Sequence, residues 1–391
     1  MGCGTAAPNK FRDRVKGTVS MNTKISRSRS VLFVVLASLA VTACGGSGGG
    51  ANNSDPDSRP DIGESLLPPN EIVDGGPGRD GIPALQNPEF ESATTISVNP
   101  NSFAVAVRHN DEVKIYPHNI LDWHEIVNDG PADDPYTLSY CPLTGSAMVW
   151  KGTASHADSS YGVSGLLYNS NLLLYDRETE TLWSQMFEIG VNGPRIGELP
   201  QRLQVLEANY GTLRDMYPDA MVMTPNTGYS RDYSTYPYGF YRSNSGLLFS
   251  ISNVDNRLHP KTRVIGFRSG TGVEANPVSK VYQLGAFGPT LQAINDQVDG
   301  QDIVVVGSTD LNFAVIYSRE LADGTILTFS PLTDDLPNIM SDDEGNVWDS
   351  FGTAVSGPRA GAQLVPPRSY VAYWFAWATH FPNAQIHFNQ T

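Results

Sequence analysis

The sequence is poor in cysteine and in basic residues, and both shortages exclude classes of protein. Three cysteines in 391 residues exclude a disulfide-dense scaffold. Lysine and arginine number 26 against 41 acidic residues, and the net charge of −15 disfavours nucleic acid as a partner, because phosphate binding needs a basic surface. The chain also lacks a Gly-rich phosphate loop, a Ser-x-x-Lys pair, a His-Glu-x-x-His motif and a dinucleotide fingerprint. A hydrophobic content of 40% nevertheless predicts a folded core.

Residues 1–43 have the pattern of an export signal. Three basic residues precede an apolar run over residues 31–40, which is too short for a stable membrane span. The segment Val41-Thr42-Ala43-Cys44 follows and resembles the lipobox of bacterial lipoproteins, in which the cysteine is lipidated. An ordinary signal peptide that happens to contain a cysteine is the alternative. Met21 lies at the usual distance from the apolar run, so residues 1–20 are expected to precede the true start.

Lipidation of Cys44 would anchor the protein to a membrane of the bacterial cell envelope, facing the periplasm. Residues 44–75 are rich in Gly, Ser, Asn, Asp and Pro and are expected to form a flexible tether. Residues 1–43 hold seven basic residues and one acid, so the rest of the chain has 19 basic and 40 acidic residues and a net charge of −21. Cys141 is then the only free thiol, which leaves no intramolecular disulfide.

Residues 76–391 consist of short apolar runs interrupted by Gly, Pro, Asn and Asp, a pattern that predicts a β-rich α+β fold. Asn110-Asp111 lies between two such runs and predicts a hairpin. Helices are expected over residues 119–128, 213–217 and 373–380. Strands are expected over residues 103–108, 113–116, 136–140, 147–150, 165–168 and 172–175.

Several motifs occur twice in the same order, which predicts an internal duplication. The earlier pairs are 167 residues apart and the later ones 164. We therefore expect two tandem copies of one β-rich unit with pseudo-two-fold symmetry, over residues 96–225 and 262–391, joined by an aromatic connection over residues 226–261. The repeated segments are Asn128-Asp129 and Asn295-Asp296, Ala147-Met148-Val149-Trp150 and Ala314-Val315-Ile316-Tyr317, Gly193-Pro194-Arg195 and Gly357-Pro358-Arg359, and Tyr217-Pro218-Asp219-Ala220 and Phe381-Pro382-Asn383-Ala384.

The two expected copies differ at residues that can carry chemistry. The offset of 167 residues aligns His124, Glu125 and Cys141 of the first copy with a leucine, a glutamine and a serine of the second. An imidazole, a carboxylate and a thiol therefore occur at these positions only in the first copy, and we expect any functional site there.

Several segments resemble those of a known family, among them His124-Glu125-Ile126-Val127-Asn128-Asp129 and Tyr140-Cys141-Pro142-Leu143-Thr144-Gly145-Ser146-Ala147. On these segments the chain resembles a family of bacterial and archaeal proteins known only as domain of unknown function 3179. The resemblance covers residues 76–391 and implies a domain extent but no activity. The family commonly has a second cysteine where this chain has Thr144, a departure that disfavours an obligate dithiol or a two-thiolate metal site. The matching segments are Gly81-Ile82-Pro83-Ala84-Leu85, Tyr116-Pro117, His124-Glu125-Ile126-Val127-Asn128-Asp129, Tyr140-Cys141-Pro142-Leu143-Thr144-Gly145-Ser146-Ala147, Ser164-Gly165-Leu166-Leu167-Tyr168-Asn169, Leu174-Tyr175-Asp176-Arg177-Glu178-Thr179 and Leu182-Trp183-Ser184-Gln185.

A metal site in the first copy is the first of three functional hypotheses. His124 and Cys141 offer the nitrogen and sulfur ligands that copper or zinc prefers. Asp176, Glu178 or Glu125 would add oxygen ligands. Their spacing matches no zinc ribbon or finger, and a buried structural cysteine near a hydrogen-bonded histidine is the alternative for the same residues.

An enzyme that uses a thiol and acid–base chemistry is the second hypothesis. Cys141 would act as a nucleophile activated by His124, provided that the fold brings the two side chains within hydrogen-bonding reach. Asp176 would orient the imidazole as the third member of the set. We expect the sulfur of Cys141 and the ring of His124 to lie within roughly 4–8 Å of one another, because ligand and general-base geometries both need near contact.

A binding or scaffold module without catalysis is the third hypothesis. Tyrosine and phenylalanine crowd the connection between the two copies, and such rings can stack on a glycan or anchor a protein partner. The simpler interpretation is that the rings seal the interface between the copies. The residues concerned are Tyr229, Tyr233, Tyr236, Tyr238, Phe240 and Tyr241.

Overall fold

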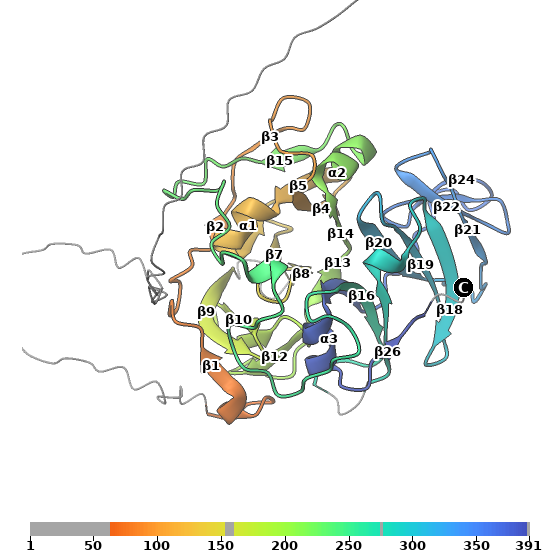
Figure 1. The fold of residues 1–391 in the computed structure, drawn as a ribbon. Helices are drawn as coiled ribbons and strands as arrows, with labels where there is room; N and C mark the ends of the chain where they lie inside the picture. The colour runs from red at the N-terminus through yellow and green to blue at the C-terminus, as the bar shows by residue number, and fades with distance from the viewer. Residues whose placement is uncertain (1–62, 153–159, 274–276, 389–391) are drawn as a thin grey trace, which may run out of the picture. The chain divides into compact units, whose positions relative to one another are not determined.

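The computed structural model describes residues 63–152, 160–273 and 277–388 (Figure 1). The expected signal over residues 1–43, Cys44 and most of the expected tether lie outside these residues. The described chain is rich in β-structure and includes three short α-helices, as the sequence predicts. Within these residues, no helix is long and apolar enough to cross a membrane. We refer to residues 63–225 as the first half, to residues 226–261 as the connection and to residues 262–388 as the second half.

The strands of the first half form three sheets. One has the order β1 (Ile72–Asp74), β9 (Tyr161–Tyr168), β10 (Asn171–Asp176), β11 (Leu182–Ser184) and β12 (Ile189–Asn192). The second has the order β13 (Gln201–Leu203), β8 (Ser146–Lys151), β7 (Tyr136–Cys141), β6 (Ile126–Asp129) and β2 (Leu85–Gln86). The third has the order β14 (Val205–Asn209), β4 (Phe103–His109), β5 (Glu112–Pro117), β15 (Met221–Met223) and β3 (Phe90–Ser92).

The strands of the second half also form three sheets. The first has the order β25 (Ser369–Tyr373), β16 (Arg263–Arg268), β17 (Ser279–Gln283) and β26 (Gln385–Ile386). The next contains β18 (Gln292–Val298), β19 (Gln301–Ser308) and β20 (Phe313–Ser318). The last has the order β21 (Phe329–Pro331), β22 (Asn338–Asp342), β23 (Val347–Asp349) and β24 (Ala354–Ser356).

The sheets of the two halves have corresponding strand orders. The order β14-β4-β5-β15 in the first half corresponds to β25-β16-β17-β26 in the second, and the last pair is parallel in both. A seven-residue helix precedes the parallel strand in each case, α2 (Tyr210–Met216) before β15 and α3 (Trp374–His380) before β26. The antiparallel sets β6-β7-β8 and β18-β19-β20 correspond in the same way.

Equivalent polar side chains make equivalent contacts in the two halves. The Asn128 amide donates to the carbonyl of Tyr161 and accepts from its N–H, both at 2.9 Å. Asn295 makes the same two contacts with Phe329, at 2.8 and 2.9 Å. Such an asparagine joins two strands that do not pair with each other. Further corresponding contacts are Tyr116–Asp129 with Tyr282–Asp296, and Asp176–Trp183 with Asp342–Trp348.

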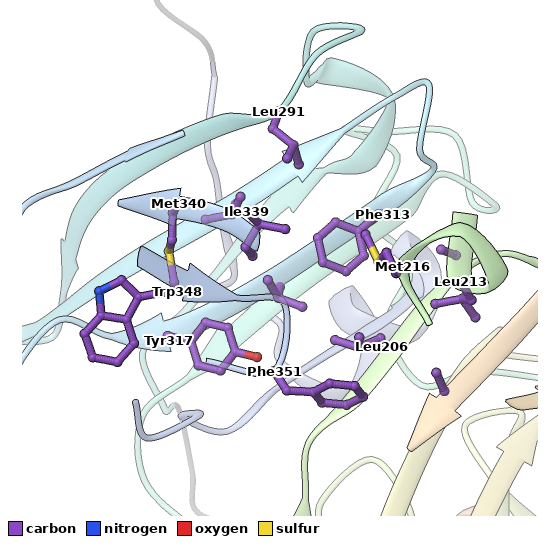
Figure 2. Packing of buried hydrophobic residues seen from close by; sticks show 14 of the residues in the cluster. Leu206, Leu213, Met216, Leu291, Phe313, Tyr317, Ile339, Met340, Trp348 and Phe351 are labelled. Carbon is purple, nitrogen blue, oxygen red and sulfur yellow. The ribbon is translucent and has the colours of Figure 1, made fainter. Parts of the chain in front are cut away.

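One hydrophobic cluster contains residues of both halves. Leu206 and Leu213 come from β14 and α2, and Phe313 and Trp348 come from β20 and β23 (Figure 2). All four side chains are fully enclosed. Burial of such side chains stabilises a fold by about 1.5–3 kcal/mol each relative to exposure. The apolar surface of each half is therefore covered in part by the other.

Two local expectations from the sequence differ in outcome. Asn110 and Asp111 have φ of +51° and +63°, the left-handed pair of a tight hairpin, which confirms the turn between β4 and β5. The helix expected over residues 119–128 is instead α1 (His118–His124), and β6 follows it after one residue. Glu125 has a φ of +58°, which a helix cannot contain, so the chain leaves the helix there.

The ordered domain begins earlier than the composition indicates. The tether was expected to extend to residue 75, but β1 pairs with β9, after a short 3₁₀-helix η1 (Pro69–Glu71). Leu67 and Ile72 are buried in an apolar cluster and hold this segment against the first sheet. The burial of these two apolar side chains is sufficient to order the segment, although most residues around them are polar.

The connection crosses from the first half to the second with little regular structure. Its only described helix is the 3₁₀-helix η2 (Tyr241–Ser243); a further 3₁₀-helix, η3 (Leu284–Ala286), follows β17 in the second half. Tyr233 and Tyr238 of the connection contact α1, and Asn253 donates to a carbonyl of α3. The connection therefore contacts the end of α1 in the first half and α3 in the second half.

Candidate functional site

The candidate site lies where α1 ends beside β7. The N–H of Glu125 closes the helix by donating to the carbonyl of Leu121 at 2.8 Å. The carbonyl of Glu125 accepts from the N–H of Tyr140 at 2.7 Å. This bond ties the helix end to the strand one residue before Cys141. A positive φ in glutamate costs of order 1 kcal/mol, and such strain is concentrated at functional sites.

Two carboxyl groups are buried at this helix end. Asp122 and Glu125 are only 3% and 5% exposed. Burial raises the pKa of Glu125 to about 7; the hydrogen bond from Tyr238 opposes the rise and the charge of Asp122 adds to it. Burial likewise raises the pKa of Asp122 to about 7, against the attraction of Arg242. Groups with a pKa near 7 can both give and take a proton at neutral pH.

Both carboxyl groups are held by side chains of the connection. The Tyr238 hydroxyl donates to Oε1 of Glu125 at 2.9 Å. The Arg242 guanidinium donates to Asp122 at 2.5 Å and to the Tyr140 hydroxyl at 3.0 Å. The connection thus supplies a neutral partner to one acid and a charged partner to the other.

Cys141 is the last residue of β7 and is buried beside Glu125. Its side chain lies in an apolar cluster, and its thiol donates to the carbonyl of Ser170 at a distance of 3.9 Å. Burial, together with the charge of Glu125, raises the pKa of the Cys141 thiol to about 11. The thiol is therefore protonated at neutral pH, so Cys141 in this closed arrangement is not an activated nucleophile.

Both ring nitrogens of His124 contact groups other than the thiol. Its Nδ1 lies 2.8 Å from the carbonyl of Pro83, and its Nε2 lies 2.7 Å from the Tyr233 hydroxyl. A carbonyl only accepts, so Nδ1 carries the proton and Nε2 accepts from Tyr233. Burial lowers the pKa of His124, which favours this neutral ring. The described residues contain no hydrogen bond between His124 and Cys141.

Asp176 is engaged in a turn of the first sheet. Its carboxylate accepts from the indole N–H of Trp183 at 2.9 Å and from the N–H of Thr179 at 2.7 Å. Asp342 accepts from Trp348 at 2.8 Å in the corresponding turn of the second half. Because the same contact occurs in both halves, a role in folding is sufficient to explain why the chain has an aspartate at position 176.

The expected metal ligands are not gathered at one point. Within the described residues, no three or more His, Cys, Asp and Glu side chains form a group that could hold a metal ion. His124, Glu125 and Cys141 share one region, but the imidazole nitrogens are directed to Pro83 and Tyr233. This geometry does not favour the copper or zinc site that the residue types suggested.

Thr144 occupies the position at which the resembling family commonly has a second cysteine. Its hydroxyl is 2.8 Å from the Ser146 hydroxyl and accepts from the Asn171 amide at 2.9 Å. Gln185 accepts from both Ser146 and Asn171. A buried polar network therefore replaces a thiol at this position.

Asp122 and Arg242 were not identified from the sequence, and Tyr238 was expected only as one of the rings of the aromatic connection. Asp122 precedes Glu125 by three positions, a helical spacing that would have placed both acids on one face. Tyr238 and Arg242 lie more than a hundred residues further along the chain. Arg242 directly follows Tyr241 at the end of the tyrosine-rich segment, but only the fold shows that it pairs with Asp122.

The comparisons with known proteins agree with the extent of the domain. The family model described as "Protein of unknown function (DUF3179)" matches residues 79–384. The comparisons found no matching curated protein and no matching solved structure. The matched span includes every residue of the site described above.

Proposed function

The chain belongs to the DUF3179 family, whose description assigns no activity, and we propose from the geometry that it performs acid–base chemistry with Glu125 as the proton-transferring group. Asp122 and Arg242 would position the helix end and the connection around it. Cys141 would line the site as a neutral thiol. Of the residues predicted from the sequence, this assignment keeps Glu125 and Cys141 and gives His124 a positioning role.

One observation carries the proposal: a glutamate with positive φ is buried beside a thiol, and its pKa is about 7. Burying a carboxyl without a cation is unfavourable, so a fold retains such a group when it has a use. In its ionised form Glu125 would accept a proton from a bound molecule, and in its protonated form it would return one. Tyr238 donates to the carboxyl in either form.

The titration of Glu125 tests this proposal. Glutamate labelled with ¹³C at the carboxyl carbon would be followed by NMR from pH 4 to pH 9 in the wild type and in Glu125→Gln. The resonance that is missing in the variant belongs to Glu125, and its midpoint is expected near pH 7. A midpoint near the ordinary value for glutamate would remove the support for an acid–base role.

The protein is further proposed to be a lipoprotein of the bacterial cell envelope. The support is the sequence of residues 41–44 after a basic and apolar segment, followed by a polar stretch. Cys44→Ser should release the protein from membranes into the soluble envelope fraction. Full membrane retention of this variant, with normal cleavage after Ala43, would contradict lipidation at Cys44.

The two halves are proposed to be tandem copies of one unit. The support is the common strand order, the helix before each parallel strand, and the equivalent contacts of Asn128 and Asn295. Cys141 ends β7 and Ser308 ends β19, in agreement with the offset that aligns them. The copies then differ where the first one carries the acids and the thiol.

A binding role is the second candidate function. Phe240 and Tyr229 of the connection are 84% and 45% exposed, and exposed rings can stack on a glycan or anchor a protein. Binding of cell-wall glycan fragments to the wild type and to Phe240→Ser would be compared by calorimetry. Equal heats of binding for the two proteins, or no heat of binding for either, would show that Phe240 has no role in glycan binding.

A further inference from the structure

Residues 229–238 of the connection lie against the candidate site. Tyr238 at one end contacts Glu125, and Tyr233 in the middle contacts His124. The polar and charged residues Ser230, Arg231, Asp232 and Ser234 are exposed. The segment therefore has one face toward the site and one toward water. We refer to residues 229–238 as the flap.

The flap is attached to the first half through side chains. The Asn119 amide donates to the carbonyl of Tyr233, and the Trp123 indole donates to the carbonyl of Thr235, both at 3.1 Å. Within the described chain, the flap takes part in no strand pairing, and its backbone–backbone hydrogen bonds remain within turns of the connection. Segments held in this way open at a lower free energy than paired strands.

A glycine with positive φ stands at each end of the flap. Gly228 has a φ of +79° and Gly239 a φ of +58°, a region that glycine enters without steric cost. A β-carbon added at either position would meet no atom within 4 Å. Neither glycine is therefore required by close packing. Glycines placed in this way can absorb the backbone rotation of a hinge.

We propose that the flap is a gate that turns about Gly228 and Gly239 to admit a small molecule to Glu125 and Cys141. Tyr233 and Tyr238 are the latches that hold the flap to the site, since their hydroxyls donate to His124 and Glu125. Arg242 lies outside the hinges and stays with Asp122 when the flap opens. The gate controls access to the site of the acid–base proposal, and its role in function rests on that proposal.

The reactivity of Cys141 reports on the gate. In the full chain with Cys3→Ser and Cys44→Ser, Cys141 is the only thiol, and 4,4′-dithiodipyridine would label it only when the site opens. Tyr233→Phe and Tyr238→Phe each remove one latch, which should raise the labelling rate roughly tenfold, the factor expected for the loss of one hydrogen bond. The double variant should label faster than either single variant.

Tyr317→Phe is the matched control, because the Tyr317 hydroxyl donates to a backbone carbonyl of the second half at 2.7 Å. Its labelling rate should equal that of the parent chain if opening is local. A rise in all three variants in proportion to their loss of global stability would show that Cys141 is exposed only by unfolding, and would overturn the gate.

Amide hydrogen exchange gives an independent readout. Peptides covering residues 229–239 should exchange faster than those covering β7, and faster again in Tyr233→Phe. Equal protection of both regions in the wild type would overturn the gate even if a tyrosine variant failed to fold. Neither measurement requires the pKa of Glu125 to lie near 7, so failure of the acid–base proposal would appear only in its own titration.

Discussion

The Tyr238 hydroxyl donates to Oε1 of Glu125 at 2.9 Å, across 113 positions of the sequence. The carboxyl comes from the end of α1 and the phenol from the connection between the halves. Because the bond joins a strained, buried acid to a segment without strands, the protonation of Glu125 and the closure of the connection are physically linked. Substitution of Tyr238 should therefore change the pKa of Glu125, and substitution of Glu125 should change how tightly the connection is held.

Glu125→Gln should change how stability depends on pH. The pKa of Glu125 is about 7 in the folded protein and near 4.5 in the unfolded chain, so the folded state holds the proton between these values. Wild-type stability arising from this group is therefore lost as the pH rises from about 4.5 through 7. Relative to the wild type, the variant should gain up to about 1.4 kcal/mol per pH unit in that range.

Urea denaturation of both proteins at pH 5, 6, 7 and 8 would measure this difference in the free energy of unfolding. The difference isolates Glu125 from other groups that titrate in the same range. Glu91→Gln, at an exposed position, is the control. Parallel stability curves for wild type and Glu125→Gln would contradict the raised pKa.

Asp176→Asn and Asp342→Asn should cost similar free energies of unfolding. Each aspartate accepts from a buried indole, at 2.9 Å from Trp183 and at 2.8 Å from Trp348. The loss of one such acceptor costs about 1–3 kcal/mol. Thermal and urea unfolding would give both values, and a cost for Asp342→Asn alone would show that the two turns are not equivalent.

The periodicity of apolar residues was sufficient to predict much of the β-structure. The Asn110-Asp111 turn sets the pairing of β4 with β5, and both strands match the expected ranges closely. The helix before β6 was predicted too long, because propensity does not show that Glu125 would take a positive φ. That conformation depends on burial and on the bond from Tyr140, which are tertiary effects.

The candidate site was predictable only in part. The contrast between the two expected copies indicated Glu125 and Cys141, since the offset of 167 residues aligns them with a glutamine and a serine. The same contrast suggested that His124 would serve Cys141, whereas the imidazole contacts Pro83 and Tyr233. Sequence spacing cannot give the direction of a side chain at a helix end, because the chain turns sharply after it.

Leu213→Ala and Phe313→Ala should each destabilise the whole domain. Both side chains are fully buried in one cluster, although Leu213 belongs to the first half and Phe313 to the second (Figure 2). Truncation of such residues costs about 2–5 kcal/mol. Tryptophan fluorescence and amide exchange should show one common transition for both halves. Leu248→Ala, at a 56% exposed position, is the control, and two separate transitions would contradict the shared core.

The last prediction concerns the protonation of His124. Because Pro83 accepts at Nδ1 and Tyr233 donates to Nε2, ¹⁵N NMR should show a neutral ring with its proton on Nδ1. Burial lowers the pKa of His124 below 6.5, so the unfolded chain takes up the proton first, and the stability associated with this ring is lost as the pH falls below 6.5.

Tyr233→Phe removes the donor to Nε2 and loosens the segment that covers the ring, so the pKa of His124 should move up toward its ordinary value. Tyr317→Phe, which also loses a tyrosine hydrogen bond, should leave that pKa unchanged. A proton on Nε2 in the wild type, or a midpoint at or above 6.5, would show that His124 is not an acceptor for Tyr233. The imidazole would then not hold the flap closed, and Tyr238 would remain as its single latch.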